Sequence, residues 1–237
     1  MLFPDDAPAA RLWRAHERLN AQYGVQEIYG RRDRMHQLIS TILSHRTTHA
    51  NETTAYQRMR ERFGTWEAIR DAPLPELIET LRTATYPDVK ALHIQRVLTR
   101  IIEERGEASI DFLDDLPTDD ALRWLLSLPG VGPKTATLVL LFNFARPVLP
   151  VDTHVHRVTQ RLGIIGPKVS TERAHQILLA LLPADAPTLF NFHKHFYWHG
   201  QRICTWSEPR CARCVLRDDC AHARARHAAE AGNGTVL

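Results

Sequence analysis

Apolar residues recur at helical spacing along almost the whole chain, and this period constrains the fold more than any other feature. Apolar–polar alternation with hairpin turns is lacking, so β-structure is expected to be minor. Proline and glycine interrupt the pattern at short intervals, which predicts roughly ten helices of about 8–16 residues. The sequence therefore predicts an all-α fold. The clearest apolar stripes are Leu38, Ile39, Ile42 and Leu43; Leu74, Leu77, Ile78 and Leu81; and Ile94, Val97, Leu98, Ile101 and Ile102.

Composition places the chain among globular proteins. It has 237 residues, of which 44% are hydrophobic and 24% charged, enough for one large domain or two small ones. No apolar run approaches a membrane span, and the first six residues lack the basic-then-apolar order of a signal peptide. We therefore expect an intracellular protein without a membrane partner. Residues 223–237 contain few core-forming side chains and are expected to be a disordered tail.

The positive charge comes almost wholly from arginine. The net charge is +3, with 26 arginines against four lysines, Lys90, Lys134, Lys168 and Lys194. A mildly basic chain permits a nucleic-acid partner. Arginine binds phosphate well but does not deprotonate, so an amine nucleophile would have to be one of the few lysines.

A Pro/Gly-rich turn joins two expected helices in the middle of the chain. Asp119–Leu128 has a helical pattern, Pro129–Gly132 forms the turn, and Pro133 opens the next helix at the position that proline prefers. Glycines allow close backbone approach, and the amides of the new helix could bind a phosphate without reading sequence. The alternative is an ordinary turn between two helices.

Lys134 lies in the first turn of the second helix, where the helix dipole disfavours a cation. The dipole and partial burial are expected to lower the pKa of its amine. A lysine must lose its proton to act as a nucleophile, so the position favours covalent catalysis. The alternative is a solvated surface lysine.

A further helix is expected to begin after Asp152 and to end at Gly163. Asp152 is placed as its N-cap, a role worth about 1 kcal/mol. The same carboxylate could stabilise a developing cation or activate a nucleophile. Lys134 and Asp152 are separated by one helix and one loop, so an antiparallel return could bring both helix starts to one cleft.

All four cysteines lie near the end of the chain with the spacing C-x6-C-x2-C-x5-C: Cys204, Cys211, Cys214 and Cys220. Four thiolates suit zinc or a [4Fe–4S] cluster. Zinc ribbons usually have two C-x-x-C pairs and this segment has one, which favours the cluster. The arginines between the ligands could contact phosphates or solvate the loop.

The order and spacing of three motifs resemble the endonuclease III family of helix-hairpin-helix DNA glycosylases. The motifs are Leu128–Ala136, Val151–Val155 and the cysteine tail, with weaker similarity at Ile42–Thr48. The resemblance implies two helical domains flanking a DNA cleft. Residues 27–146 would form a six-helix barrel with the hairpin, and residues 1–26 plus 147–222 a domain with a [4Fe–4S] cluster.

The resemblance also implies an activity. The chain would be a bifunctional base-excision-repair enzyme that removes oxidised pyrimidines and cleaves abasic sites through a lysine Schiff base. Lys134 would be the nucleophile and Asp152 its acid partner. The substrate would be double-stranded DNA with damaged bases or abasic sites, bound by a monomer in the cytoplasm at the nucleoid. The expected DNA contacts are Leu128, Pro129, Gly130, Val131, Gly132, Thr135, Arg46 and His154.

Some positions depart from the family pattern. Pro133 replaces a basic residue, Arg46 stands where glutamine is common, and residues 83–91 lack the Gly–apolar start of the second DNA-inserting loop. These departures leave the proposed chemistry intact and bear on the lesion range and turnover. Two alternatives stay open beside the bifunctional enzyme. One is a glycosylase without lyase activity, and the other a non-catalytic DNA-binding module with a structural cluster.

Overall fold

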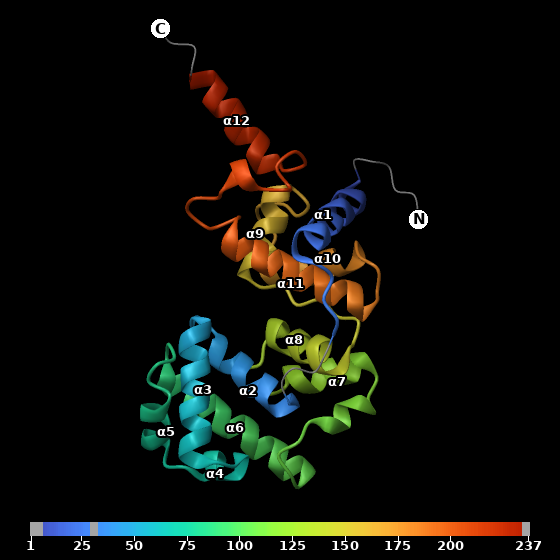
Figure 1. The fold of residues 1–237 in the computed structure, drawn as a ribbon. Helices are drawn as coiled ribbons and strands as arrows, with labels where there is room; N and C mark the ends of the chain where they lie inside the picture. Colours follow the sequence, from blue (N-terminus) through green and yellow to red (C-terminus); the bar gives the residue numbers. More distant parts are fainter. Residues whose placement is uncertain (1–6, 29–32, 234–237) are drawn as a thin grey trace. The chain divides into compact units, whose positions relative to one another are not determined.

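The computed structural model describes residues 7–28 and 33–233, and all regular secondary structure in these residues is helical (Figure 1). The prediction of an all-α fold is confirmed.

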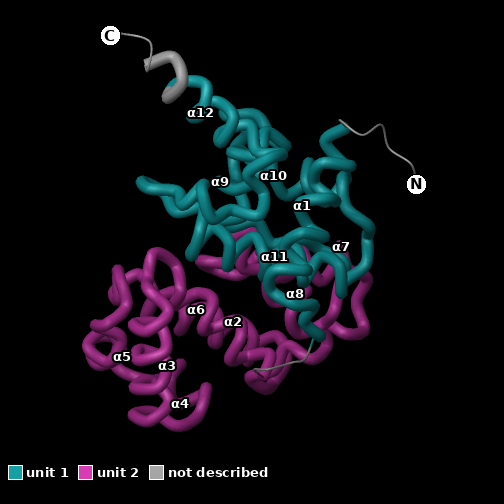
Figure 2. The backbone as a smooth tube through the Cα atoms, turned by 45° about the horizontal axis from the view of Figure 1, so that its top comes forward, with its two compact units in different colours: residues 1–28, 147–237 teal, residues 29–146 magenta. Residues whose placement is uncertain are grey.

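The helices form two compact units, distinguished in Figure 2: unit 1 comprises Met1–Ile28 and Pro147–Leu237, and unit 2 comprises Tyr29–Arg146. None of the described helices has the length and apolar character needed to cross a bilayer. The first six residues, on which the expected lack of a signal peptide rests, lie outside the described residues.

Unit 2 is built around α2, which packs against α3, α6 and α8. The predicted stripe on α2 is confirmed as core, since Leu38, Ile39, Ile42 and Leu43 are at most 1% exposed. α8 is buried on nearly all sides from Thr135 to Leu141, so the helix is anchored in the unit immediately after its first two residues. The helices of unit 2 are α2 (Arg34–Ser44), α3 (His49–Phe63), α4 (Trp66–Asp71), α5 (Leu74–Thr80), α6 (Pro87–Arg105), the 3-10 helix η1 (Asp111–Asp114), α7 (Thr118–Leu126) and α8 (Pro133–Phe144).

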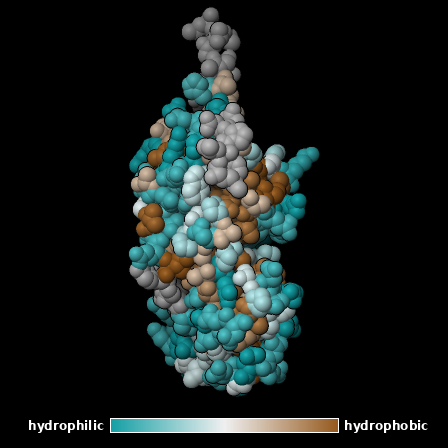
Figure 3. Space-filling model, turned by 90° about the vertical axis from the view of Figure 1, so that its right-hand side faces the viewer, coloured by the Kyte–Doolittle hydropathy of each residue, from teal (hydrophilic) through white to brown (hydrophobic). Residues whose placement is uncertain are grey.

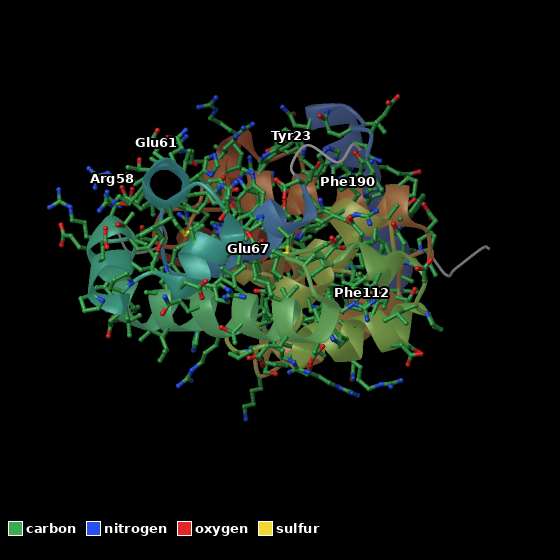
Figure 4. All side chains as sticks on the ribbon, turned by 90° about the horizontal axis from the view of Figure 1, so that it is seen from below. Tyr23, Arg58, Glu61, Glu67, Phe112 and Phe190 are labelled. Atoms are coloured by element: carbon green, nitrogen blue, oxygen red, sulfur yellow. The ribbon has the colours of Figure 1, made fainter. Side chains whose placement is uncertain are left out.

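Aromatic contacts fix η1 to its neighbours in unit 2. The Phe112 ring, labelled in Figure 4, meets Trp124 of α7 edge-to-face with centroids 4.8 Å apart. The guanidinium of Arg105 lies 4.0 Å from the Phe112 ring centroid, a cation–π contact with the end of α6. The loop that leads into α7 is thus held to the body of the unit.

Unit 1 centres on α11, which packs against α1 and α9. Phe192 and Phe196 stack in its core with centroids 4.0 Å apart. Histidines His16, His193, His195 and His199 are also buried there. The helices of unit 1 are α1 (Pro8–Tyr23), α9 (Thr153–Leu162), α10 (Thr171–Ala180), α11 (Ala186–Arg202), the 3-10 helix η2 (Cys211–Arg213) and α12 (Ala221–Asn233).

Two sequence expectations differ from the structure. The described residues contain twelve α-helices rather than about ten, partly because α4 and α5 have only six and seven residues and show little periodicity. The tail expected to be disordered from residue 223 is helical as far as Asn233, and its last four residues lie outside the described part. Alanine and arginine are strong helix formers, and α12 packs against α9, which explains the difference.

Large apolar side chains on the surface are scattered, which is normal for a globular protein. The face drawn in Figure 3 mixes hydrophilic and hydrophobic residues. Two of the exposed side chains, Tyr86 at 54% and Val89 at 45%, fall within segment 83–91. The exposed members among the described residues are Val25, Tyr86, Val89, Leu126, Trp206 and Val215.

Candidate functional site

The turn between α7 and α8 has two buried apolar anchors with glycine between them. Leu128 and Val131 are 3% and 6% exposed, and the Val131 N–H donates to the Leu128 carbonyl over 3.2 Å. Gly130 has φ +74°, and a Cβ there would overlap the His93 ring. Only glycine fits this position. Because the side chains of Leu128 and Val131 hold the turn in place, any contact that these residues make with DNA would go through the backbone.

The start of α8 has no capping side chain. Gly132 is its N-cap, with φ −98° and ψ −179°, and Pro133 occupies the first helical position. Pro129 and Gly132 are partly accessible, and Lys134, the second residue of the helix, is half-buried. A helix N-terminus without its own side-chain acceptor is suited to an external anion.

His45 lies beside this helix start, although sequence reasoning did not identify it. It is the C-cap of α2, and its Nε2 is 2.9 Å from the hydroxyl of Thr135 in the first turn of α8. Burial, together with the positive charges of Lys134 and Lys90, lowers the pKa of His45 to about 4. The imidazole is therefore neutral at neutral pH. Its place immediately before Arg46 was the signal that could have identified it.

Arg46 and segment 83–91, which the sequence analysis singled out as two separate departures from the family pattern, lie side by side in unit 2. The Arg46 carbonyl accepts a hydrogen bond from Thr85 Oγ1 at 2.9 Å, and the Thr85 N–H donates to Thr47 Oγ1 at 3.1 Å. Arg46 is exposed. Both Arg46 and Tyr86 adopt the left-handed region, with φ +53° and +56°. One surface of the unit thus presents both residues.

In unit 1, Asp152 caps α9, which confirms its predicted structural role. Its Oδ1 accepts hydrogen bonds from the N–H groups of His154 at 2.9 Å and Val155 at 2.8 Å. Gly163 ends the helix in the left-handed conformation, as predicted. Both cap bonds go to Oδ1, which leaves Oδ2 of this half-buried carboxylate outside the cap.

His154 is fixed by its neighbours in unit 1. Its Nδ1 lies 3.1 Å from Nη2 of the buried Arg157, and its ring meets Tyr197 edge-to-face at 5.2 Å. A Cβ at Gly200 would come within 2.7 Å of His154 Cβ, so α11 approaches α9 closely here. The backbone at the start of α9 is therefore held rigidly, and His154 makes packing contacts besides any contact with DNA.

The four cysteines line one small pocket together with Arg161, Arg217 and His222. Cys204 Sγ accepts a hydrogen bond from Arg161 Nη1 at 3.3 Å, and Cys214 Sγ lies 3.4 Å from His199 Nε2. Burial raises the pKa of the Cys214 thiol to about 11. Within the described residues no set of three or more His, Cys, Asp or Glu side chains is grouped to hold a metal ion.

Comparison with known proteins identifies the family. The model for "HhH-GPD superfamily base excision DNA repair protein" matches residues 39–184, more than half of the chain. Endonuclease III of Thermotoga maritima is 34% identical over 198 residues, which cover 84% of this chain and 87% of that protein. The chain belongs to the endonuclease III family of the HhH-GPD superfamily.

Other relatives agree with membership of the endonuclease III family. DNA glycosylase/AP lyase ROS1 of Arabidopsis thaliana is 32% identical over 172 residues, or 66% of this chain but 12% of that much longer protein. A solved structure of a trapped endonuclease III–DNA covalent intermediate, an estranged-adenine complex, superposes with a TM-score of 0.80 at 25% identity. The match covers 96% of this chain and all of that one.

The donor set in this endonuclease III homologue suits an iron–sulfur cluster chemically. All four cysteines line the same pocket, and Arg161, Arg210 and Arg217 in its lining bring positive charge to offset thiolates. The lining residues thus fit the group that the sequence predicts.

Proposed function

We propose that this chain is a bifunctional DNA glycosylase and abasic-site lyase that acts on oxidised pyrimidines in double-stranded DNA. The observation that carries the proposal is the position of Lys134 in the first turn of α8, directly after a helix start without a side-chain cap. Phosphate at the helix start would hold the strand, and the lysine beside it would reach the sugar of an everted nucleotide. Membership of the endonuclease III family supports the same activity.

The proposed chemistry runs through the amine of Lys134. The nitrogen attacks C1′ of the sugar, the bond from C1′ to the base breaks, and the base leaves with the electron pair and takes up a proton. The C1′–O4′ bond of the ring then breaks, O4′ leaves with the electron pair and takes up the second amine proton, and a Schiff base forms between C1′ and the lysine nitrogen. Loss of a proton from C2′ then expels the 3′ phosphate, and water releases the lysine. One amine thus accounts for both base removal and strand cleavage.

Asp152 is proposed to stabilise the positive charge that develops at C1′. Its Oδ1 is engaged by the amides of α9, which fixes the carboxylate in place, while Oδ2 can face the reacting sugar.

We further propose that Arg46, His154 and the backbone of residues 128–132 contact DNA, and that the enzyme acts as a monomer on nucleoid DNA. Thr135, which the sequence also predicted as a DNA contact, is buried and contacts His45, so its proposed role is to position the helix start. Dissociation constants for duplex DNA, with light scattering for the molecular mass of the complex, test both statements.

Cys204, Cys211, Cys214 and Cys220 are proposed to hold a [4Fe–4S] cluster, which would cross-link the segment between α11 and α12. Purified protein is expected to absorb broadly in the visible range and to contain equal amounts of iron and acid-labile sulfide. Cys214→Ser is expected to lose this absorption and to lower the melting temperature. A colourless protein that contains zinc would contradict the assignment.

Product analysis tests the activity. Duplexes with thymine glycol, dihydrouracil, 8-oxoguanine or an abasic site would be incubated with the wild type, with Lys134→Ala and with the matched control Lys168→Ala, which alters an exposed lysine. The expected result is strand cleavage without alkali at oxidised pyrimidines, lost in Lys134→Ala alone. Cleavage only after alkali would support a glycosylase without lyase activity, and binding without any product would support a non-catalytic module.

A further inference from the structure

Lys90 has a buried amine that the proposed chemistry does not use. It lies in the first turn of α6 and is only 4% exposed. Its Nζ donates to the carbonyls of Leu43 and His45, both at 2.7 Å, and to Thr47 Oγ1 at 2.6 Å. An ammonium has three donors, and here all three are used. A buried charge is tolerated only when paired in this way, so the contacts are specific.

The acceptors belong to the end of α2 and the turn that follows it. α2 ends at Ser44, so the carbonyls of Leu43 and His45 lie at the negative end of the helix dipole. Carbonyls of the last helical turn have no partner within their own helix. Lys90 supplies that partner from another helix and thereby fixes the path of the chain into Arg46.

The same network reaches segment 83–91. Thr47 Oγ1 accepts from Lys90 and also from the Thr85 N–H at 3.1 Å. Thr85 Oγ1 in turn donates to the Arg46 carbonyl at 2.9 Å. The turn that contains Arg46 and the turn that contains Thr85 are therefore linked by one hydrogen-bond network centred on the Lys90 amine.

Each of these turns holds a strained residue. Arg46 and Tyr86 both have positive φ, a conformation that is unfavourable for a residue with a Cβ. Such conformations persist only where the surrounding structure enforces them. The two side chains are nevertheless exposed, with no core packing of their own to favour the conformation. The hydrogen bonds around Lys90 supply the constraint.

His45 extends the network to the start of α8. Its carbonyl is held by Lys90, and its ring lies 2.9 Å from the hydroxyl of Thr135, the residue after Lys134. The turn that carries Arg46 and the helix that carries Lys134 thus share one anchored residue.

We propose that Lys90 is a positioning residue, which holds Arg46 and Tyr86 as a preformed DNA-facing pair and, through His45, sets the first turn of α8. The inference rests on the proposed function of Arg46 and Lys134. Folding then already holds Arg46 and Tyr86 in their strained conformations before DNA binds, so binding does not have to impose them. Lys90 contributes in this way without contacting the nucleotide.

The test compares Lys90→Met and Thr47→Val with Arg96→Met. Lys90→Met removes the three hydrogen bonds at similar volume, and Thr47→Val removes one hydroxyl and leaves the amine in place. Arg96→Met removes an exposed positive charge from the same helix. Hydrogen exchange of residues 45–48 and 84–87 is measured without DNA. Single-turnover base excision at saturating enzyme is measured in parallel with the KM.

Lys90→Met and Thr47→Val are expected to exchange faster in both segments and to lose about tenfold or more in single-turnover rate, because small misplacements of reacting groups are costly. Arg96→Met should match the wild type. If Lys90→Met does not fold, Thr47→Val decides. Wild-type exchange and rates in Thr47→Val would overturn the inference while leaving the proposed function intact, whereas an inactive wild type would overturn the proposed function instead.

Discussion

Two helix starts, one in each unit, have nearly the same N-cap backbone dihedral angles but differ in whether a side chain caps the helix. The N-cap of α8 is Gly132 with φ −98° and ψ −179°, and the N-cap of α9 is Asp152 with φ −102° and ψ −176°. The N-cap side chains differ, since glycine has none and aspartate supplies a carboxylate. The Asp152 carboxylate accepts hydrogen bonds from the first free N–H groups of α9 and is held in place by them. The first N–H groups of α8 have no such side-chain acceptor and could bind an external anion. A single N-cap residue therefore decides whether a helix start holds a carboxylate or is suited to bind a phosphate.

The largest expected effect separates the two roles of Asp152. Asparagine caps helices as well as aspartate does, so Asp152→Asn should change the free energy of unfolding by less than about 0.5 kcal/mol. Removal of the charge should lower base excision by about 10²–10⁴-fold. Asp152→Ala should lose the activity and also about 1 kcal/mol of stability. Normal excision rates in Asp152→Asn would reduce Asp152 to a cap.

The next prediction concerns the stability of unit 1, which contains α9, at acidic pH. Burial lowers the pKa of His16 and of His195 from 6.5 to about 4. Between these values the unfolded chain binds protons that the folded chain excludes. The free energy of unfolding is therefore expected to fall as pH falls from about 6.5 to about 4, by at most about 3 kcal/mol per histidine, and to be fully retained above this range.

Urea unfolding at pH 7 and pH 5, with hydrogen exchange resolved by unit, measures this acid effect. The double variant His16→Gln/His195→Gln should be less stable at pH 7 but should depend less on pH. An unchanged pH dependence in the double variant would place the acid sensitivity elsewhere.

A smaller effect comes from making α8 resemble α9. Gly132→Asp places a capping carboxylate where the backbone already suits it and where a Cβ meets no atom within 4 Å. Stability should rise by a few tenths of a kcal/mol. Affinity for duplex DNA should fall by about tenfold to a hundredfold, the value of one or two hydrogen bonds to a charged acceptor. Gly132→Ala is the steric control, and equal affinity in Gly132→Asp and the wild type would exclude a phosphate at this helix start.

Features set by neighbours in sequence could be predicted. The stripe on α2, the cap at Asp152 and the helix end at Gly163 each depend on a few consecutive residues. α12 was missed because its apolar-poor composition was taken as a sign of disorder, whereas alanine and arginine favour a helix even where most side chains are exposed. The contacts of Lys90 and His45 could not be predicted, since their partners lie 43–47 and 90 residues away in the chain and meet them only in the folded unit.

The most direct measurement is borohydride reduction of the enzyme on an abasic duplex, followed by mass spectrometry of the cross-linked peptide. A Schiff base at Lys134 predicts one covalent adduct on the peptide that contains Lys134, retained in Lys168→Ala and absent in Lys134→Ala. An adduct of undiminished yield in Lys134→Ala, or one on the peptide that contains Lys90, would contradict the account.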